Sequence, residues 1–236
     1  MIKAIIFDLN GVFIQSPKLS DIFSARFNVP TDIFLPALKE IMVKVRQPNA
    51  GSAFSYWKPY LEKWNVNLSE KDFFDFWFNS EKEDIKMTDL AKKLKEQGIK
   101  LFILSNNFTE RSEHYDENFP FLKRLFEKVY FSWQTGFVKP DPAAYQNILQ
   151  ENDLRPEECV YFDDSEQNIK SAGSLGIQGF IFKDAGETQG IIQKLTLDIK
   201  RGQNCAMCPQ GHVVRFCLIL RQVLLCCRIN VVRRNK

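Results

Sequence analysis

The sequence of 236 residues shows neither the pattern of a secretory leader nor a long uncharged hydrophobic run. The amino terminus passes directly into a short apolar stretch, without the basic region, apolar region and small-residue cleavage site of a secretory signal. The apolar run that starts at Val213 is interrupted by Arg215, Arg221 and Arg228, so it does not suit a membrane-spanning helix. We therefore expect a cytoplasmic protein with reduced thiols and no membrane partner.

Acidic residues are absent after Asp198, and the last part of the chain is basic. The basic residues there are Lys200, Arg201, Arg215, Arg221, Arg228, Arg233, Arg234 and Lys236. Subtracting these eight charges from the formal net charge of +3 leaves −5 for the rest of the chain. An acidic body does not have the charge of a nucleic-acid-binding protein, so we expect no nucleic-acid partner for the main domain.

Cysteine and histidine are scarce before this basic tail, where Cys159 and His114 are the sole examples. Cys159 lies in an apolar, strand-like stretch and is expected to pack rather than react. The neighbours of His114, which are Glu113, Tyr115 and Asp116, indicate a solvated surface. We therefore expect no catalytic thiol or imidazole in the main domain.

The basic tail, residues 200–236, contains Cys205, Cys208, His212 and Cys217 in an order that resembles a zinc knuckle, a module that binds nucleic acid. The spacing between Cys208 and His212 is one residue shorter than in a usual knuckle. Zinc binding stays an alternative, as does contact with nucleic acid or an anionic membrane. Because the tail shows no helix or strand periodicity, we favour the interpretation that it is disordered or extraneous.

Strand-like apolar stretches alternate with helical patterns in much of the remaining sequence. The expected strands are the run that ends at Asp8 and residues 99–104, 129–131, 159–162 and 177–182. Helical patterns cover residues 89–97, 121–128, 141–151 and 165–175. This alternation is typical of βαβ units and a parallel sheet.

Aromatic-rich helical patterns fill residues 16–86, where no strand is evident. We therefore predict an α/β fold, in which residues 1–15 and 87–199 form a Rossmann-like, doubly wound parallel sheet core and residues 16–86 form an inserted α-helical cap. Most aromatic side chains of the cap are expected to pack between its helices. Phe13, Tyr56 and Trp57 are candidates to face a functional site instead.

Polar residues follow the expected strands. In chain order they are Asp8 and Asn10, Ser105 and Asn106, Lys139, and Asp163 and Asp164. Because right-handed crossovers place the carboxyl ends of parallel strands at one edge, these side chains should meet there. An aspartate can attack phosphorus, Mg²⁺ on one or two carboxylates can neutralise the phosphoryl oxygens, and a hydroxyl and an ammonium can hold them. The set therefore suits phosphoryl transfer.

These residues also resemble a known family. Asp8-Leu9-Asn10-Gly11-Val12, Ser105-Asn106, Lys139-Pro140 and Asp163-Asp164 match, in order and approximate spacing, the four motifs of the haloacid dehalogenase-like hydrolase superfamily. The match is most similar to its subfamily I phosphatases with a helical cap and covers roughly residues 1–185. Asp163-Asp164-Ser165, followed by Asn168 and Gly173, is similar to glucose-1-phosphatase-like members and to the phosphatase domain of soluble epoxide hydrolase.

The resemblance implies a Mg²⁺-dependent phosphatase that acts on a small phosphorylated metabolite through an aspartyl-phosphate, with monomer and dimer both open. It implies that Asp8 is the nucleophile and a metal ligand, together with the backbone carbonyl of Asn10. Asp164 and Asp163 would complete the metal site, Asp163 by orienting waters or Lys139. The remaining residues, Ser105, Asn106 and Lys139, would bind the phosphate, and Lys139 would also balance charge during catalysis.

Asn10 departs from the family pattern, because phosphatases of this superfamily usually carry an acid–base Asp at that position. Such a group typically contributes about 10² to 10⁴ in rate. The enzyme could favour good leaving groups, borrow a base from the cap or from water, or bind a phosphate or phosphosugar with weak or no turnover. A metal-independent 2-haloacid dehalogenase is a further alternative, but it gives no reason for the Asp163-Asp164 pair.

Overall fold

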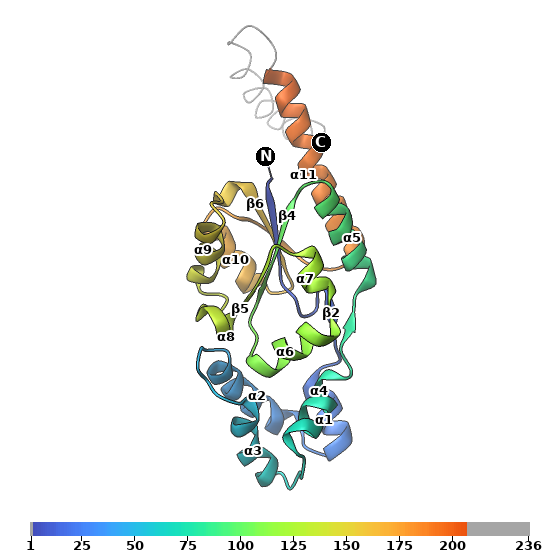
Figure 1. The fold of residues 1–236 in the computed structure, drawn as a ribbon, viewed down its shortest axis with the longest axis vertical. Coiled ribbons are helices and arrows are strands. Elements are labelled where there is room, and N and C mark those ends of the chain that lie inside the picture. Colours follow the sequence, from blue (N-terminus) through green and yellow to red (C-terminus); the bar gives the residue numbers. More distant parts are fainter. Residues whose placement is uncertain (1, 207–236) are drawn as a thin grey trace, which may run out of the picture. The chain divides into compact units, whose positions relative to one another are not determined.

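The computed structural model describes residues 2–206. Within them, parallel strands form a sheet with the order β5-β4-β1-β6-β7 (Figure 1). The strands are β1 (Ala4–Phe7), β4 (Lys100–Ser105), β5 (Lys128–Phe131), β6 (Cys159–Asp163) and β7 (Gln178–Ile181). The predicted α/β fold with a doubly wound parallel sheet is confirmed.

The central strand β1 has the sequence Ala-Ile-Ile-Phe and is buried along its whole length, as expected for a strand that is covered on both faces. It pairs with β4 on one side and with β6 on the other, so that Phe7 lies opposite both Ile103 and Phe162. The chain therefore adds β4 and β5 on one side of β1 and then crosses to add β6 and β7 on the other. This reversal is the topological switch point of the sheet.

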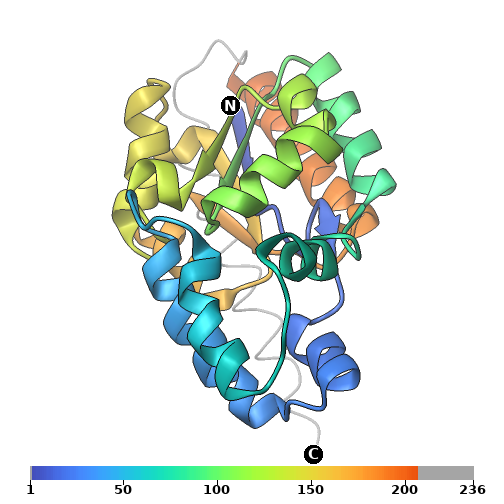
Figure 2. The same cartoon turned by 60° about the horizontal axis from the view of Figure 1, so that its bottom comes forward.

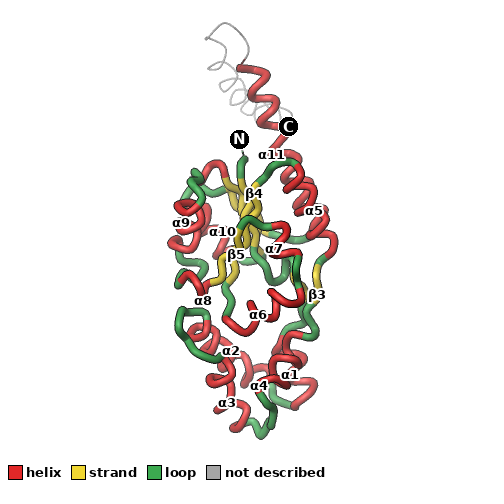
Figure 3. Tube along the Cα trace, in the orientation of Figure 1, coloured by secondary structure: helices red, strands yellow, loops and turns green. Residues whose placement is uncertain are grey.

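Helices cover both faces of the sheet (Figure 3). On one face, α9 (Pro142–Glu151) and α10 (Glu166–Ser174) pack against alternate strand residues, including Ile6 and Tyr161. The other face is covered by α5 (Ile85–Glu96) and α7 (Phe121–Leu125) (Figure 1). The remaining elements outside the insertion described next are α6 (Thr109–Asn118), α8 (Ser132–Thr135), the 3-10 helix η1 (Pro156–Glu158) and α11 (Ala185–Ala206).

Between β2 (Ile14–Gln15) and β3 (Lys82–Glu83) lie α1 (Leu19–Phe27), α2 (Thr31–Val45), α3 (Ala53–Lys63) and α4 (Glu70–Phe78). We call α1–α4 the helical insertion. It lies beyond the carboxyl ends of the sheet strands (Figures 1 and 2). The strands β2 and β3 pair antiparallel, so the chain enters and leaves the insertion through one two-stranded ribbon.

Aromatic side chains form the core of the helical insertion, as expected. Trp57 is fully buried and stacks on Phe34, with ring centroids 5.3 Å apart. Phe13 is also fully buried and packs edge-on against Phe7, while the Tyr56 hydroxyl donates to the backbone oxygen of Ala50. The hypothesis that Phe13 and Trp57 face a functional site is therefore wrong, because neither side chain is exposed.

Several boundaries differ from the sequence-based expectations. Strand β3 lies within 16–86, where no strand was expected. A strand of two residues is too short to show the alternation of apolar and polar residues by which strands are recognised. Helix α5 begins at Ile85, four residues before the expected start, since the Asp84 side chain accepts from the backbone N–H of Met87 (3.1 Å) and caps the helix. Helix α6 was not expected, because its sequence is almost wholly polar.

The expected division between the core and the tail stays a prediction. Helix α11 continues through Ala206, past the predicted division at 199–200. The zinc-knuckle residues Cys208, His212 and Cys217 lie outside the described residues. No helix in the described part of the chain is long and apolar enough to span a bilayer.

Candidate active site

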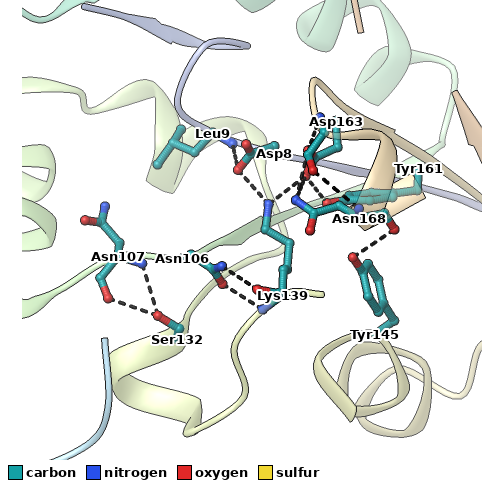
Figure 4. A network of polar contacts seen from close by, with 11 residues as sticks. Asp8, Leu9, Asn106, Asn107, Ser132, Lys139, Tyr145, Tyr161, Asp163 and Asn168 are labelled. Atoms are coloured by element: carbon teal, nitrogen blue, oxygen red, sulfur yellow. Dashed lines mark hydrogen bonds and ion pairs between the residues drawn. The ribbon is translucent and has the colours of Figure 1, made fainter. Parts of the chain in front are cut away.

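The sheet places the motif residues at neighbouring strand ends. Asp8 follows β1, Ser105 ends β4 and Asp163 ends β6, and these strands are adjacent in the sheet. The site therefore lies at the switch point, where open α/β sheets bind their ligands. Lys139 arrives from the loop after α8 and points between the two aspartates (Figure 4).

Lys139 forms the centre of a buried charge cluster. Its Nζ lies 2.8 Å from Asp8 Oδ1 and 2.8 Å from Asp163 Oδ2, and its side chain is 2% exposed. Burial alone would lower the pKa of Lys139, but the two carboxylates outweigh it and raise the pKa above its ordinary value. Lys139 is therefore a fixed ammonium at this edge of the sheet.

The backbone of Lys139 is held by Asn106. The amide oxygen of Asn106 accepts from the Lys139 N–H (2.8 Å), and its amide nitrogen donates to the Lys139 carbonyl (2.8 Å). These two bonds place Asn106 as the residue that aligns the Lys139 loop with the end of β4. Its predicted contact with phosphate stays a prediction.

Asp163 is fully buried and accepts hydrogen bonds at both carboxylate oxygens. Oδ2 accepts from Lys139 Nζ, from the Tyr161 hydroxyl and from Asn168 Nδ2, and Oδ1 accepts from the Ser165 N–H (2.8 Å) and from Asn168 Nδ2. Burial would raise the pKa of Asp163, but the Lys139 ammonium and these donors outweigh it and lower the pKa. The arrangement suits a carboxylate that orients Lys139.

Asp8 is less enclosed, with a side chain that is 14% exposed. Its Oδ1 accepts from the Leu9 N–H (2.7 Å) as well as contacting Lys139. Burial and the nearby Asp163 charge raise the pKa of Asp8 above its ordinary value, against the opposing effect of Lys139. Asp8 is thus held in one orientation, with Oδ2 lacking a hydrogen-bond partner among residues 2–206.

A divalent cation fits beside Asp8. Carboxylate oxygens of Asp8, Asp163 and Asp164 all lie within 4.8 Å of one another, and Asp164 is the exposed member. Gly11 has a φ of +83°, and a Cβ there would lie 3.3 Å from Asp164 Oδ2, so glycine both permits the turn and leaves room for this carboxylate. Oxygen donors of this kind suit Mg²⁺.

Ser105 supplies a hydroxyl at the end of β4. The residue is 1% exposed, and its Oγ has no hydrogen-bond partner in the described part of the chain. A buried hydroxyl without a partner is costly, so a ligand oxygen at this position would satisfy it.

Asn10 lies in a hydrogen-bonded chain that sequence reasoning missed. Its Nδ2 donates to the Tyr115 hydroxyl (2.6 Å), which donates to Glu81 Oε1 (3.3 Å). Arg111 forms an ion pair with the same carboxylate, which is fully buried. These hydrogen bonds and the ion pair connect the loop after β1 to α6 and to the segment between α4 and β3.

A small pocket of about 200 Å³ opens above these residues. It is lined by Asp8, Asn10, Arg46, Ser105, Asn106, Arg111, Lys139 and Asn168. Of these, Arg46 and Arg111 had not been singled out from the sequence. Arg46 directly precedes the polar break after α2. Its position as a charged residue at the end of an amphipathic helix was the only feature of the sequence that could have pointed to a role in the pocket.

Comparison with known proteins places the chain in a family. The model of the haloacid dehalogenase-like hydrolases matches residues 2–176. This chain belongs to the haloacid dehalogenase-like hydrolases. The resemblance inferred from the four motifs is confirmed.

Two curated proteins are similar to most of this chain. Acyl-CoA dehydrogenase family member 10 of Mus musculus is 28% identical over 193 residues, which is 74% of this chain and 17% of that protein. Bifunctional epoxide hydrolase 2 of Sus scrofa is 26% identical over 219 residues, or 83% of this chain and 39% of that protein. The chain therefore spans well under half the length of these two curated relatives.

A solved structure shares the fold over most of its length. A haloacid dehalogenase family enzyme of Bacteroides thetaiotaomicron, crystallised with magnesium and inorganic phosphate, is 25% identical, with a TM-score of 0.65. The match covers 78% of this chain and 95% of that enzyme.

Proposed function

We propose that this hydrolase is a Mg²⁺-dependent phosphatase that cleaves small phosphomonoesters through a phosphorylated Asp8. The observation that carries the proposal is the position of Lys139 between Asp8 and Asp163, with Asp164 beside them, at the switch point of the sheet. The magnesium and phosphate bound by the Bacteroides enzyme support the same chemistry. The acidic pair favours it over metal-independent dehalogenation, which needs no cation.

In the proposed first step, Asp8 Oδ2 attacks phosphorus in line with the leaving oxygen. The Leu9 N–H and Lys139 Nζ hold Oδ1 and so fix the direction of attack. An Oδ2–P bond forms as the bond to the leaving oxygen breaks, and Lys139 balances the phosphoryl charge while Ser105 Oγ donates to one phosphoryl oxygen. In the second step, water attacks phosphorus and gives a proton to solvent, the Oδ2–P bond breaks with its electron pair returning to Asp8, and inorganic phosphate leaves.

Asp8, Asp164 and the backbone carbonyl of Asn10 would hold Mg²⁺, which supplies neutralisation of the phosphoryl oxygens. Asn10 cannot donate a proton, so the leaving oxygen takes its proton from solvent. We therefore expect substrates with acidic leaving groups, such as aryl or acyl phosphates, to react faster than alkyl phosphates.

The test is release of phosphate from p-nitrophenyl phosphate with and without Mg²⁺. Replacing Asp8 with Asn should abolish the Mg²⁺-dependent release, because an amide cannot form the aspartyl-phosphate, which is an acyl phosphate. Asp89→Asn, which removes an exposed carboxylate from α5, is the matched control and should keep full activity. A wild-type protein that turns over none of a broad panel of phosphomonoesters with Mg²⁺ would contradict the proposal. Halide release from a 2-haloacid that survives chelation would support dehalogenation instead.

A further inference from the structure

One charged residue in the pocket has no role in the chemistry described above. Arg46 follows α2 in the helical insertion and lines the pocket together with Asp8. Its Nε is buried and lacks a hydrogen-bond partner, and its guanidinium forms no ion pair among the described residues. Burial lowers the pKa of Arg46, and the nearby Arg111 charge acts in the same direction. Arg46 as a whole is partly buried, and a guanidinium whose buried Nε has no partner is unfavourable unless a ligand completes the site.

The other cations of the pocket are already paired. Lys139 contacts two carboxylates, and Arg111 is paired with the buried Glu81. Arg46 is therefore the pocket cation whose charge is not matched by a carboxylate within the described residues. An anion bound beside Arg46 would be stabilised by the positive charge of the guanidinium and by hydrogen bonds from its two parallel N–H donors.

The geometry of phosphoryl transfer indicates which part of a substrate reaches Arg46. Asp8, Ser105 and Lys139 line the pocket, and in the proposed mechanism they hold the phosphoryl group at the sheet edge. In-line attack by Asp8 places the leaving oxygen on the opposite side of phosphorus, away from β1. The helical insertion lies beyond the carboxyl ends of the strands, on that side (Figure 2). A group attached to the leaving oxygen therefore points toward the insertion that carries Arg46.

We propose that Arg46 binds a second anionic group, a carboxylate or a phosphate, on the leaving-group side of the substrate. This inference rests on the proposed phosphatase function and specifies its substrate class as small phosphomonoesters that carry a second negative charge. The pocket of about 200 Å³ is small beside the roughly 300–1,000 Å³ of sites for drug-sized ligands, so only a few atoms separate the two charges.

The test compares substrates that differ only in the second charge. One pair is 2-carboxyethyl phosphate and its uncharged amide, and the other is the bisphosphate and monophosphate of 1,3-propanediol. Wild-type protein should favour the charged member of a pair in kcat/KM, and the better pair identifies the anion. Arg46→Met should lose about tenfold to a hundredfold on the charged substrate and little on the uncharged one, with Arg46→Lys in between. Lys39→Met removes an exposed charge from the same helix and should change neither.

Equal losses on charged and uncharged substrates would overturn the inference, because Arg46 would then bind the transferring phosphoryl group. No loss on either would overturn it as well. Calorimetric titration of Asp8→Asn protein, with and without Arg46→Met, measures the same preference without turnover. An inert wild-type protein would count against phosphatase activity, while a charge preference lost with Arg46 would still support the anion site. Thermal midpoints complete the test. A lower midpoint for Arg46→Met together with equal losses on the two substrates would show a purely structural Arg46 and would overturn the inference.

Discussion

Asn10 shows how one polar residue is fixed by its neighbours rather than left free in a pocket. Its amide nitrogen donates to Tyr115, and Tyr115 in turn contacts the buried Glu81 carboxylate. Burial of the hydroxyl, which outweighs the nearby Arg111 charge, raises the pKa of Tyr115 well above its ordinary value. Tyr115 therefore stays protonated and acts as a neutral hydrogen-bond partner, not as a substitute acid for the leaving group.

This arrangement predicts the effect of adding the missing acid. Asn10→Asp should raise kcat on alkyl phosphates, by up to about 10²- to 10⁴-fold, because the leaving alkoxide needs a proton. The gain on p-nitrophenyl phosphate should be much smaller, since that leaving group is acidic. Steady-state kinetics on the two substrates measure the difference, with Asn10→Ala as the control that removes the amide without adding an acid. An Asn10→Asp protein that folds but gains nothing on alkyl phosphates would contradict the prediction.

The sequence revealed the residues that end strands and missed those that helices bring to the site. Asp8, Ser105 and Asp163 could be placed together because buried strands are recognisable and parallel topology aligns their ends. Arg46 and Arg111 could not, because they lie at the end of α2 and within α6, and they reach the pocket only through the tertiary arrangement of these helices. That arrangement depends on contacts far apart in the chain, which periodicity does not record.

At the scale of elements, α6 anchors the helical insertion. The Phe108 ring, next to the start of α6, packs against Trp77 of α4 with centroids 5.4 Å apart. Glu110 accepts from the backbone N–H of Ala53, the first residue of α3 (2.7 Å), and so places a carboxylate at a helix N-terminus. The segment that follows β4 thus fixes the insertion as well as the Lys139 loop.

We therefore expect Glu110→Ala to weaken the contact between α6 and α3. The free energy of unfolding should fall by about 0.5–2 kcal/mol, the range for losing a helix-capping side chain, as measured by urea denaturation. Glu113→Ala removes an exposed glutamate from the same helix and serves as the control. Equal stability of the two variants would show that the Ala53 contact contributes nothing.

At the scale of the whole molecule, one carboxylate connects the starts of β1 and β6 at the end of the sheet opposite the site. Glu158 accepts from Lys3 Nζ and from Arg155 Nη2, both at 2.8 Å, while its backbone oxygen accepts from the Lys3 N–H. Hydrogen bonds from Arg155 and Lys3 lower the pKa of Glu158 to about 2. The folded protein therefore releases this proton more readily than the unfolded chain does.

Because the folded-state pKa lies below the unfolded value of 4.5, the stabilisation by Glu158 is complete above pH 4.5 and is lost as the pH falls toward 2. Glu158→Gln should lower stability near neutral pH and flatten its dependence on pH in this window. Denaturant unfolding at pH 3 and pH 6 measures the effect, with the exposed neighbour Glu157→Gln as the control. A pH dependence that matches the wild type would contradict the prediction.

The β2–β3 ribbon has a consequence for how this protein can be altered. Ile14 pairs with Glu83 and Gln15 with Lys82, so the two ends of a segment of more than 60 residues are held side by side. Changes of length within that segment need not disturb the register of the five parallel strands, because the ribbon that holds its ends is a separate sheet from those strands. The segment could therefore be exchanged for another of different length to change the substrate specificity, provided that the Glu81–Arg111 ion pair beside the ribbon is kept.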